Sequence, residues 1–495
     1  MRISGSISER DFPLMFVLTL IMLLQVSLGI TYLYDWAQHG TAGVWAYGAA
    51  ALLSYPITMA AALVVLVGIQ HVVWLGAHPK ATGKKIVARI LEHQVRQLRR
   101  RHHVKVVAVA GSVGKTSTKL AIAQLLGQTM RVRYQAGNYN DRITVPLIFF
   151  GQSQPPIYNI FSWMRLFGEN AAAIEHPYPY DVVVVELGTD GPGQMQKFAY
   201  VKPDITVLTA IAPEHMAYFG TLDAVASEEL TVCEYSKKLL VNADDTPSKY
   251  LVGREFFSYS IRMHATHNYY ATSRASGLDG QVLSIDLPSG EIESHIVYVG
   301  AQGATCALAA SAVAHQLGMG RSDIAAGLER LTKIPGRMQV LEGMKGITII
   351  DDTYNASPLA VKAALDVLYA TRSSNRIALL GSMNELGGYS RKAHTEVGQY
   401  CDPKKLAMVI TLGSDAERWL APAAREQGCV VHSFSSPNAC AAFIRKHLKP
   451  RTVLLAKGSQ NGVFAEEVVK QLLARPADSA QLVRQSRAWL RKKSA

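Results

Sequence analysis

Two long uncharged segments precede a chain that otherwise alternates short apolar runs with helical patterns. Residues 12–34 and 41–77 contain no Asp, Glu, Lys or Arg, and each exceeds the ~20 residues that a helix needs to cross a hydrocarbon core. Pro56 divides the second segment, so its span is expected at about 57–76. The pattern predicts a two-helix transmembrane hairpin. A cleaved signal peptide is less favoured, because a second apolar segment follows at once.

Residues 80–103 predict a basic helix with a broad apolar side. Its apolar positions are Ile86, Val87, Ile90, Leu91, Val95 and Leu98. Two interpretations stay open: the helix lies along an anionic lipid surface, or it is a connector whose cations only set the orientation of the hairpin. No aromatic residue is interleaved with the cations, so we expect no nucleic-acid partner.

Beyond residue 103, apolar β-branched runs alternate with helical patterns, which is typical of an α/β fold. Strands are expected at 104–110, 181–187, 205–210, 347–352, 376–381, 406–412 and 452–456, and a helix at 117–126. With 49% hydrophobic and 18% charged residues, the chain can build large cores and is not a disordered protein. The expected domains are 1–103, 104–335 and 336–475, followed by a basic tail at 476–495.

The formal net charge of +13 lies almost entirely at the two ends of the chain. Residues 1–105 carry +7 and residues 475–495 carry +5, which leaves +1 for the rest. Lys and Arg precede the first uncharged segment and follow the second, so the positive-inside rule predicts an inner-membrane protein with both termini and the domains that follow the hairpin in the cytoplasm. The stretch 479–495 is either a second contact with the membrane surface or a solvated terminal helix.

A glycine-rich turn follows the first expected strand. Its residues are Gly111, Ser112, Val113, Gly114, Lys115, Thr116 and Ser117. Glycines let backbone N–H groups close on a phosphate, the helix N-terminus adds positive potential, Lys115 supplies a charge and the Thr116 hydroxyl can ligate Mg²⁺. The longer form of this motif has a glycine where this chain has Val109, but the flanking strand and helix favour a nucleotide-binding loop over a chance match.

Two candidate metal ligands follow the next expected strands. Glu186 ends the strand at 181–187, and a carboxylate there, beside a phosphate loop, is where a metal ligand belongs. His215 follows the strand at 205–210. A lone histidine is more often a packing or surface residue, so its position alone is weak evidence.

Nine motifs, in one order, resemble those of the Mur ligases, which are ATP-dependent amide-forming ligases of cell-wall peptide synthesis. They are AGSVGKTSTK (110–119), AGNYNDRITVP (136–146), VVELG (184–188), PEHMAYFGTLDAVA (213–226), VNADD (241–245), IPGRM (334–338), IIDDTYNASP (349–358), GSMNELG (381–387) and KGS (457–459). The series resembles the family over about residues 104–475, most closely its D-alanyl-D-alanine-adding branch. The resemblance implies a P-loop α/β ATPase domain followed by a C-terminal Rossmann-like α/β domain.

The resemblance also implies which residues act. For ATP it implies residues Gly111, Ser112, Val113, Gly114, Lys115, Thr116, Ser117, Asn242, Arg337 and Asp352, and for Mg²⁺ it implies Thr116, Glu186, His215 and Glu229. The implied catalytic residues are Lys115, Glu229, Asp351 and Asp352. The implied contacts to the acceptor or the amine are Asn138, Asn140, Tyr354, Asn355, Lys457 and Ser459.

Several positions depart from the family pattern. Glu229 stands where the family has a carbamoylated lysine, so it supplies a carboxylate on a shorter side chain; the alternative is a solvated helix residue and a lost second metal. GAQGATC (300–306) replaces a His- and Asn-containing stretch near the adenosine, and Gln460 follows KGS where the closest branch has Arg. The hairpin stands in place of the usual UDP-binding domain, which suggests an acceptor presented by the membrane.

The sequence therefore predicts a membrane-anchored ligase that joins an amino acid or dipeptide to a carboxylate through an acyl phosphate, using ATP and Mg²⁺. The expected acceptor is muropeptide-like, with a lipid-linked form left open. The lipid bilayer and other cell-wall synthesis proteins are the expected further partners. Two alternatives stay open: a nucleotide-binding scaffold without catalysis, and a ligase of the same mechanism that builds another polymer.

Overall fold

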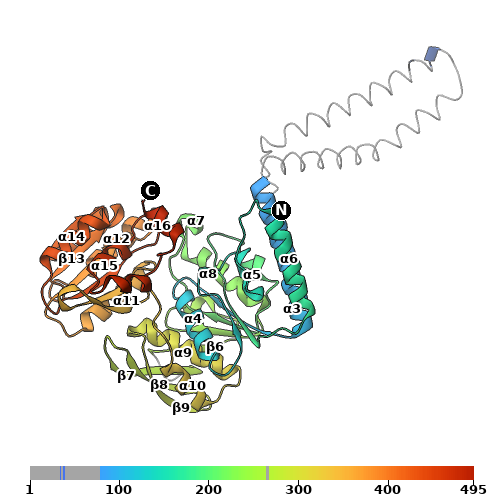
Figure 1. The fold of residues 1–495 in the computed structure, drawn as a ribbon, viewed down its shortest axis with the longest axis horizontal. Helices are drawn as coiled ribbons and strands as arrows, with labels where there is room; N and C mark the ends of the chain where they lie inside the picture. The colour runs from blue at the N-terminus through green and yellow to red at the C-terminus, as the bar shows by residue number, and fades with distance from the viewer. Residues whose placement is uncertain (1–33, 35–36, 39–78, 263–266, 495) are drawn as a thin grey trace. The chain divides into compact units, whose positions relative to one another are not determined.

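The computed structural model describes residues 34, 37–38, 79–262 and 267–494 (Figure 1). Residues 88–495 form one compact unit. Residues 1–87 form another, whose described part consists mainly of the first turns of helix α3 (Pro79–His102). The fold given below is that of residues 88–495.

The membrane location predicted from the sequence has to be corrected. Within the described ranges, no helix is both long and apolar enough to cross a bilayer. The two predicted spans, 12–34 and 57–76, lie outside the described residues. Since the described structure offers no spanning helix, we retain neither the inner-membrane location nor the lipid bilayer as a partner.

Helix α3 has the predicted length, and its apolar side packs against protein from Leu91 onward, whereas Ile86 and Ile90 are exposed. Leu91 and Leu98 are fully buried, and Leu98 belongs to the same apolar cluster as the first sheet. The Gln94 Oε1 atom accepts a hydrogen bond from Asn170 Nδ2 at 3.0 Å, so α3 lies beside α6 (Ile160–Glu175) (Figure 1). The interpretation of α3 as a helix lying on lipid is therefore corrected for Leu91, Val95 and Leu98, because protein covers these positions.

A nine-stranded sheet forms the centre of the first half of this unit. Its strand order is β2-β3-β1-β4-β5-β6-β7-β8-β9, parallel from β2 to β7 and antiparallel from β7 to β9. The strands are β1 (Lys105–Ala110), β2 (Val132–Arg133), β3 (Val182–Glu186), β4 (Ile205–Leu208), β5 (Leu239–Asn242), β6 (Phe257–Ser260), β7 (Tyr269–Ser276), β8 (Gln281–Leu287) and β9 (Gly290–Ile296). The three strands predicted here from the sequence are present, whereas the antiparallel extension was not predicted.

Helices cover both faces of this sheet because successive side chains of a strand point to opposite faces. Val107 packs with α4 (Lys115–Leu126) and α9 (Gly300–Gln316). Val106 packs on the other face with α3 and α5 (Thr144–Phe150). The shorter helices α7 (Met216–Phe219), α8 (Leu222–Leu230) and α10 (Arg321–Glu329) complete this half. Burial on both faces explains the continuous apolar runs seen in the sequence.

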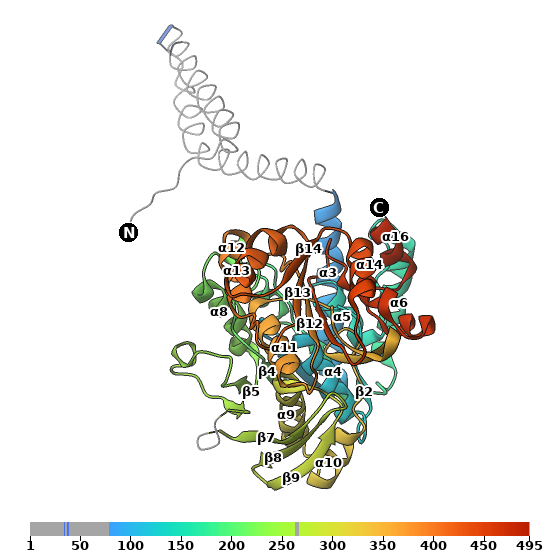
Figure 2. The same ribbon diagram turned by 90° about the vertical axis from the view of Figure 1, so that its left-hand side faces the viewer.

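A second sheet of six strands follows, in the order β10-β11-β15-β12-β13-β14 (Figure 2). Its strands are β10 (Gln339–Gly343), β11 (Ile347–Asp352), β12 (Arg376–Gly381), β13 (Met408–Leu412), β14 (Val431–Phe434) and β15 (Val453–Lys457). Its helices are α11 (Pro358–Ala370), α12 (Ser390–Gln399), α13 (Ala421–Glu426), α14 (Pro437–His447) and α15 (Ala465–Leu472). Only the β10–β11 pair among these strands is antiparallel. The predicted α/β class with a largely parallel second sheet is confirmed.

The C-terminal tail docks on the second sheet's helices. Leu482 is buried, and Arg484 pairs with the fully buried Glu466 of α15 at 2.7 Å. Lys493, in the short helix α16 (Arg487–Ser494), reaches the same carboxylate at 2.8 Å. Burial by itself would raise the pKa of Glu466, but these two cations hold it below its ordinary value. The membrane-surface interpretation is not retained, because these contacts anchor the tail to protein. The solvated terminal helix agrees with α16, where Arg487, Leu490 and Lys492 are exposed.

Candidate active site

The predicted phosphate loop connects β1 to α4. Gly111 (φ 115°) and Gly114 (φ 86°) both adopt the left-handed region that favours glycine. A Cβ atom on Gly111 would lie 2.6 Å from Thr209 Oγ1, so this position also lacks space for a side chain. Lys115 and Thr116 begin α4, where backbone N–H groups without helical partners can receive a phosphate.

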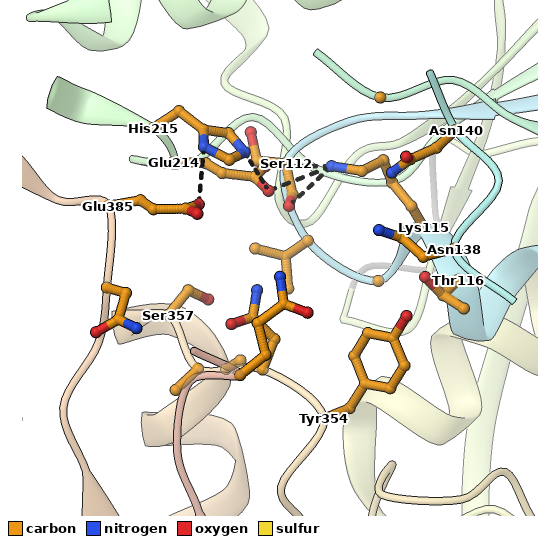
Figure 3. Close-up of a pocket in the computed structure, with 18 of the residues that line it drawn as sticks. Ser112, Lys115, Thr116, Asn138, Asn140, Glu214, His215, Tyr354, Ser357 and Glu385 are labelled. Atoms are coloured by element: carbon orange, nitrogen blue, oxygen red, sulfur yellow. Dashed lines mark hydrogen bonds and ion pairs between the residues drawn. The ribbon is translucent and has the colours of Figure 1, made fainter. Parts of the chain in front are cut away.

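Lys115 is held charged beside the loop. Its Nζ atom lies 3.2 Å from Glu214 Oε2 and 3.3 Å from the Ser112 carbonyl oxygen (Figure 3). Burial by itself would lower the pKa of Lys115, but nearby carboxylates, Glu214 first, raise it above its ordinary value. The ammonium group is therefore available to an anion that enters the site.

Glu186 ends β3, and Thr116 follows the phosphate loop. Both side chains are buried and carry oxygen atoms that can ligate a metal. The Thr116 hydroxyl donates to Glu186 Oε1 at 3.2 Å. Lys119 lies 3.2 Å from the other carboxylate oxygen, and Asn140 donates to Oε1 at 3.4 Å. Burial would raise the pKa of Glu186, yet Lys119 and Lys115 hold it below its ordinary value. Glu186 is thus an anion in a site that excludes most water.

His215 joins the two halves of the unit. Its Nδ1 atom lies 3.0 Å from Glu385 Oε2, in the segment between β12 and α12, and its Nε2 atom lies 3.5 Å from Glu214 (Figure 3). Burial alone would lower the pKa of His215, but the two carboxylates raise it to about 10. A protonated imidazole offers no lone pair, so a metal could bind there only after the proton leaves.

Arg337 and Tyr354 approach the phosphate loop from the second half. The Arg337 guanidinium carbon lies 4.0 Å from the centre of the Tyr354 ring. The buried Nε atom of Arg337 has no hydrogen-bond partner among the described residues. Because a buried donor without a partner is costly, an anionic ligand beside Arg337 would be stabilised.

A cavity of about 160 Å³ lies between these groups (Figure 3). From the first half it is lined by Ser112, Val113, Gly114, Lys115, Thr116, Asn138, Asn140, Glu186, Glu214 and His215, and from the second by Arg337, Tyr354, Asn355, Ser357, Asn384, Glu385 and Gln460. The fold thus brings together most of the predicted loop, two predicted asparagines, three of the four predicted metal ligands and three predicted residues of the second half.

A smaller cavity of about 60 Å³ shares Gly114 and Arg337 with the first. Asp352 and Lys457 line it and form a buried ion pair, and burial lowers the pKa of Lys457 despite this partner. The start of α9, which carries the GAQGATC stretch, lines the same cavity through residues that include Cys306. Lys457 therefore lies beside the phosphate loop, and not with the cavity residues predicted to contact substrate.

Glu229 lies beneath the phosphate loop and does not line the cavity. Its Oε2 atom accepts the Gly111 N–H at 2.8 Å, and burial raises its pKa to about 7. The adjacent Glu228 accepts the three backbone N–H groups of residues 193–195 at 2.6–2.7 Å. Two neighbouring carboxylates of α8 thus hold two loops of the site. We revise both earlier interpretations of Glu229, because it is neither solvated nor among the cavity's lining residues.

Three other predicted residues are not among those that line the cavity. Asn242 donates to the Thr209 carbonyl oxygen at 2.8 Å and is buried. Asp351 accepts the Thr353 N–H at 3.1 Å within its own turn, and burial raises its pKa to about 6. Ser459 accepts the Asn384 N–H at 2.9 Å. The direct contacts of these three residues with ATP or substrate therefore stay predictions.

Two family models match the chain over much of these two halves. Residues 169–314 match the Mur ligase middle domain, and residues 336–460 match the Mur ligase glutamate ligase domain. The chain belongs to the Mur ligase family. As a member of this family it is an ATP-dependent, ADP-forming carboxylate–amine ligase, so the alternative of a scaffold without catalysis is set aside.

Individual relatives agree with this assignment. The UDP-N-acetylmuramoyl-tripeptide–D-alanyl-D-alanine ligase of Haemophilus influenzae is 29% identical over 327 residues, which cover 64% of this chain and 66% of that one. The ligase of the same name from Escherichia coli is 27% identical over 378 residues, covering 74% and 76% of the two chains. The chain thus spans about two thirds to three quarters of these relatives. The crystal structure of MurF from Acinetobacter baumannii has the same fold, with a TM-score of 0.65, 22% identity and coverage of 78% and 80%.

The donor set of this Mur ligase fits Mg²⁺ bound together with nucleotide phosphates. Among the described residues, no three His, Cys, Asp or Glu side chains are grouped to hold a metal by themselves. The Thr116 hydroxyl and the Glu186 carboxylate lie 3.2 Å apart and supply the oxygen donors that Mg²⁺ prefers. Protein sites for Mg²⁺ usually provide one or two such ligands and leave the rest to phosphates and water.

Sequence reasoning missed two charged residues of the site. Glu214 and Glu385 both line the cavity and pair with His215. Each lies within a motif quoted from the sequence, PEHM or GSMNELG, so their positions were visible. Their role was not visible, because it depends on the two motifs meeting across the cavity.

Proposed function

We propose that this Mur ligase joins an amino acid or dipeptide amine to a muropeptide-like carboxylate acceptor, in the manner of the D-alanyl-D-alanine-adding relatives. The observation that carries the proposal is the cavity in which Lys115 and Thr116 of one half face Arg337, Tyr354 and Glu385 of the other. A phosphate loop alone would serve any nucleotide-binding protein. The cavity between this loop and the residues of the second half leaves room for a second substrate, and its asparagines and cations suit one that carries a carboxylate.

The site residues divide into two proposed groups. Lys115, the loop N–H groups and Arg337 bind the phosphates of ATP, and Thr116 and Glu186 would hold Mg²⁺, which supplies further neutralising charge when bound. The acceptor carboxylate takes the γ-phosphoryl group to give an acyl phosphate and ADP, and the amine then displaces phosphate. Prepositioned cations favour this reaction because negative charge accumulates on the transferring group.

The acceptor and the amine are proposed to enter on the side lined by Asn138, Asn140 and Asn355. Amide side chains can both donate to and accept from the carbonyl and N–H groups of a peptide. Gln460 lines the same cavity where the closest branch carries Arg. Gln460 cannot form an ion pair with the carboxylate of an incoming dipeptide, so we expect weaker selection for that end of the amine substrate.

A screen of acceptors and amines tests the proposal. The purified full-length protein would be incubated with ATP, Mg²⁺, UDP-muramoyl peptides and single amino acids or dipeptides, with ADP release and product mass as readouts. We expect ADP release that needs both substrates and a product heavier than the acceptor by the amine less water. Lys115→Ala should abolish it, and the exposed Lys249→Ala serves as the matched control.

Product with a carboxylate other than a muropeptide would replace the proposed acceptor and favour a ligase for another polymer. Absence of ADP release with every pair would contradict the proposal itself.

A further inference from the structure

A strongly cationic cavity lies at the N-terminal ends of the parallel strands, opposite to the end that carries the phosphate loop. It has a volume of about 500 Å³ and is lined by Arg96, Arg99, Arg100, Lys105, Lys202 and Lys237. Asp204 is the only carboxylate among its lining residues. We call it the amino-end cavity, because it lies where the parallel strands β1, β4 and β5 begin.

The topology separates this cavity from the active site. Lys105 is the first residue of β1, whereas the phosphate loop follows its last residue, Ala110. Lys202 and Lys237 likewise precede β4 and β5. A strand of six residues spans roughly 20 Å, at about 3.3 Å per residue. A ligand of the amino-end cavity therefore does not reach the phosphate loop.

The single carboxylate does not balance the cations. Asp204 pairs with Arg99 at 2.9 Å and with Lys237 at 2.7 Å, and its Oδ2 atom also accepts the Val106 N–H. Arg99 also donates to the carbonyl oxygens of Val201 and Lys202. The one carboxylate of the cavity is therefore already paired with two cations and leaves the remaining cations of the lining without a counter-charge from it.

Three cations remain without an ion pair in the described structure. Arg100, Lys105 and Lys202 are exposed and line the same cavity. The negative end of the α3 dipole favours arginines in its last turn, which accounts for Arg100. It does not account for Lys105 and Lys202, which come from two other segments. Cations gathered from separate segments produce a focused positive potential that a multivalent anion would offset.

We propose that the amino-end cavity binds a compact phosphate-bearing anion of the pyrophosphate class. The Arg100 guanidinium can contact two phosphate oxygens at once, and the two lysines supply point charges. Two aromatic residues line the cavity: Tyr200 is buried and His103 is exposed, so a single imidazole is the aromatic surface on which a nucleic-acid base could stack. The shape and charge favour a small anion over a polymer.

Calorimetric titration of the full-length protein with inorganic pyrophosphate tests the proposal. Saturating ADP and Mg²⁺ would fill the phosphate loop first, and Lys115→Ala protein would repeat the titration with that loop disabled. We expect saturable binding in both, weakened by added salt because the contacts are exposed. Glycerol 3-phosphate, titrated in parallel, distinguishes a lipid-type headgroup from a free phosphate by which of the two binds more tightly.

The decisive variant is Arg100→Ala/Lys105→Ala/Lys202→Ala, which removes three exposed charges. Its matched control is Lys404→Ala/Lys446→Ala/Arg451→Ala, which removes three exposed charges from the second half. We expect at least tenfold weaker pyrophosphate binding in the first variant and unchanged binding in the control, with equal melting temperatures. Equal affinity in both variants, or no saturable binding to the unmodified protein, would overturn the proposal.

Discussion

Charged side chains are arranged differently at the two ends of the parallel strands in the nine-stranded sheet. At the carboxyl end, charged groups are paired and mostly shielded from water: Lys115 pairs with Glu214, and His215 pairs with Glu385. At the amino end, Arg100 and Lys105 are exposed and form no ion pair in the described structure. Phosphoryl transfer needs groups whose positions are fixed before the reaction, whereas a multivalent anion can be attracted by an open field of like charges. One sheet supports both arrangements because different loops flank the two ends of its parallel strands.

The largest loss of activity is expected at the carboxyl end, where the charged groups are paired. Lys115→Ala removes the cation beside the phosphate loop, and loss of one such transition-state contact costs about 10²–10³-fold in kcat. Steady-state ADP release with the substrates identified by the screen measures it. A variant that keeps more than a tenth of the activity would mean that Arg337 and the loop N–H groups suffice.

Glu229 distinguishes support of the loop from metal binding. Glu229→Ala leaves the Gly111 N–H without its acceptor, which costs about 1–3 kcal/mol and should lower kcat/KM for ATP by about 10- to 100-fold. Glu229→Gln keeps an acceptor for that N–H and should stay within about threefold of the original. The activity is measured over a range of Mg²⁺ concentrations, with the exposed Glu426→Gln as control. If Glu229→Gln raised the Mg²⁺ requirement as much as Glu229→Ala does, the metal-ligand interpretation would return.

Substitution of Asp204 tests the ion pairs within the amino-end cavity. Its contacts outweigh burial and hold its pKa below the ordinary value, so it stabilises the fold above about pH 4 and loses this effect as the pH falls. Asp204→Ala leaves the largely buried Arg99 unpaired, and we expect a loss of about 2 kcal/mol at pH 7. Urea unfolding at pH 7 and pH 3 measures the difference. The exposed Asp223→Ala is the control, and an equal loss at both pH values would contradict the ionic origin.

The smallest effect is expected for the contact between the halves. Because the pKa of His215 is raised to about 10, its ion pair with Glu385 contributes fully below about pH 6.5 and is lost as the pH rises through 10. Glu385 is 47% exposed, so Glu385→Gln should cost only about 1 kcal/mol near pH 6 and less at pH 10. Melting temperatures across this range would show the two curves converging, whereas a constant difference would assign the effect to packing.

The sequence by itself determined seven of the strands and the phosphate loop. The apolar runs at 181–187 and 347–352 are strands because burial on both faces demands continuous apolar residues. Gly114 and Lys115 are interpretable from consecutive residues alone, since a strand, a tight turn and a helix N-terminus are local features.

Only the tertiary structure decided which side chains meet. The apolar side of α3 could face lipid or protein, because both are apolar; the burial of Leu91 and Leu98 decides for protein. Glu228 and Glu229 differ by one position, yet each holds a different loop. His215 and Glu385 are 170 residues apart. Such contacts depend on how the two sheets pack, and the spacing of residues along the chain carries no record of it.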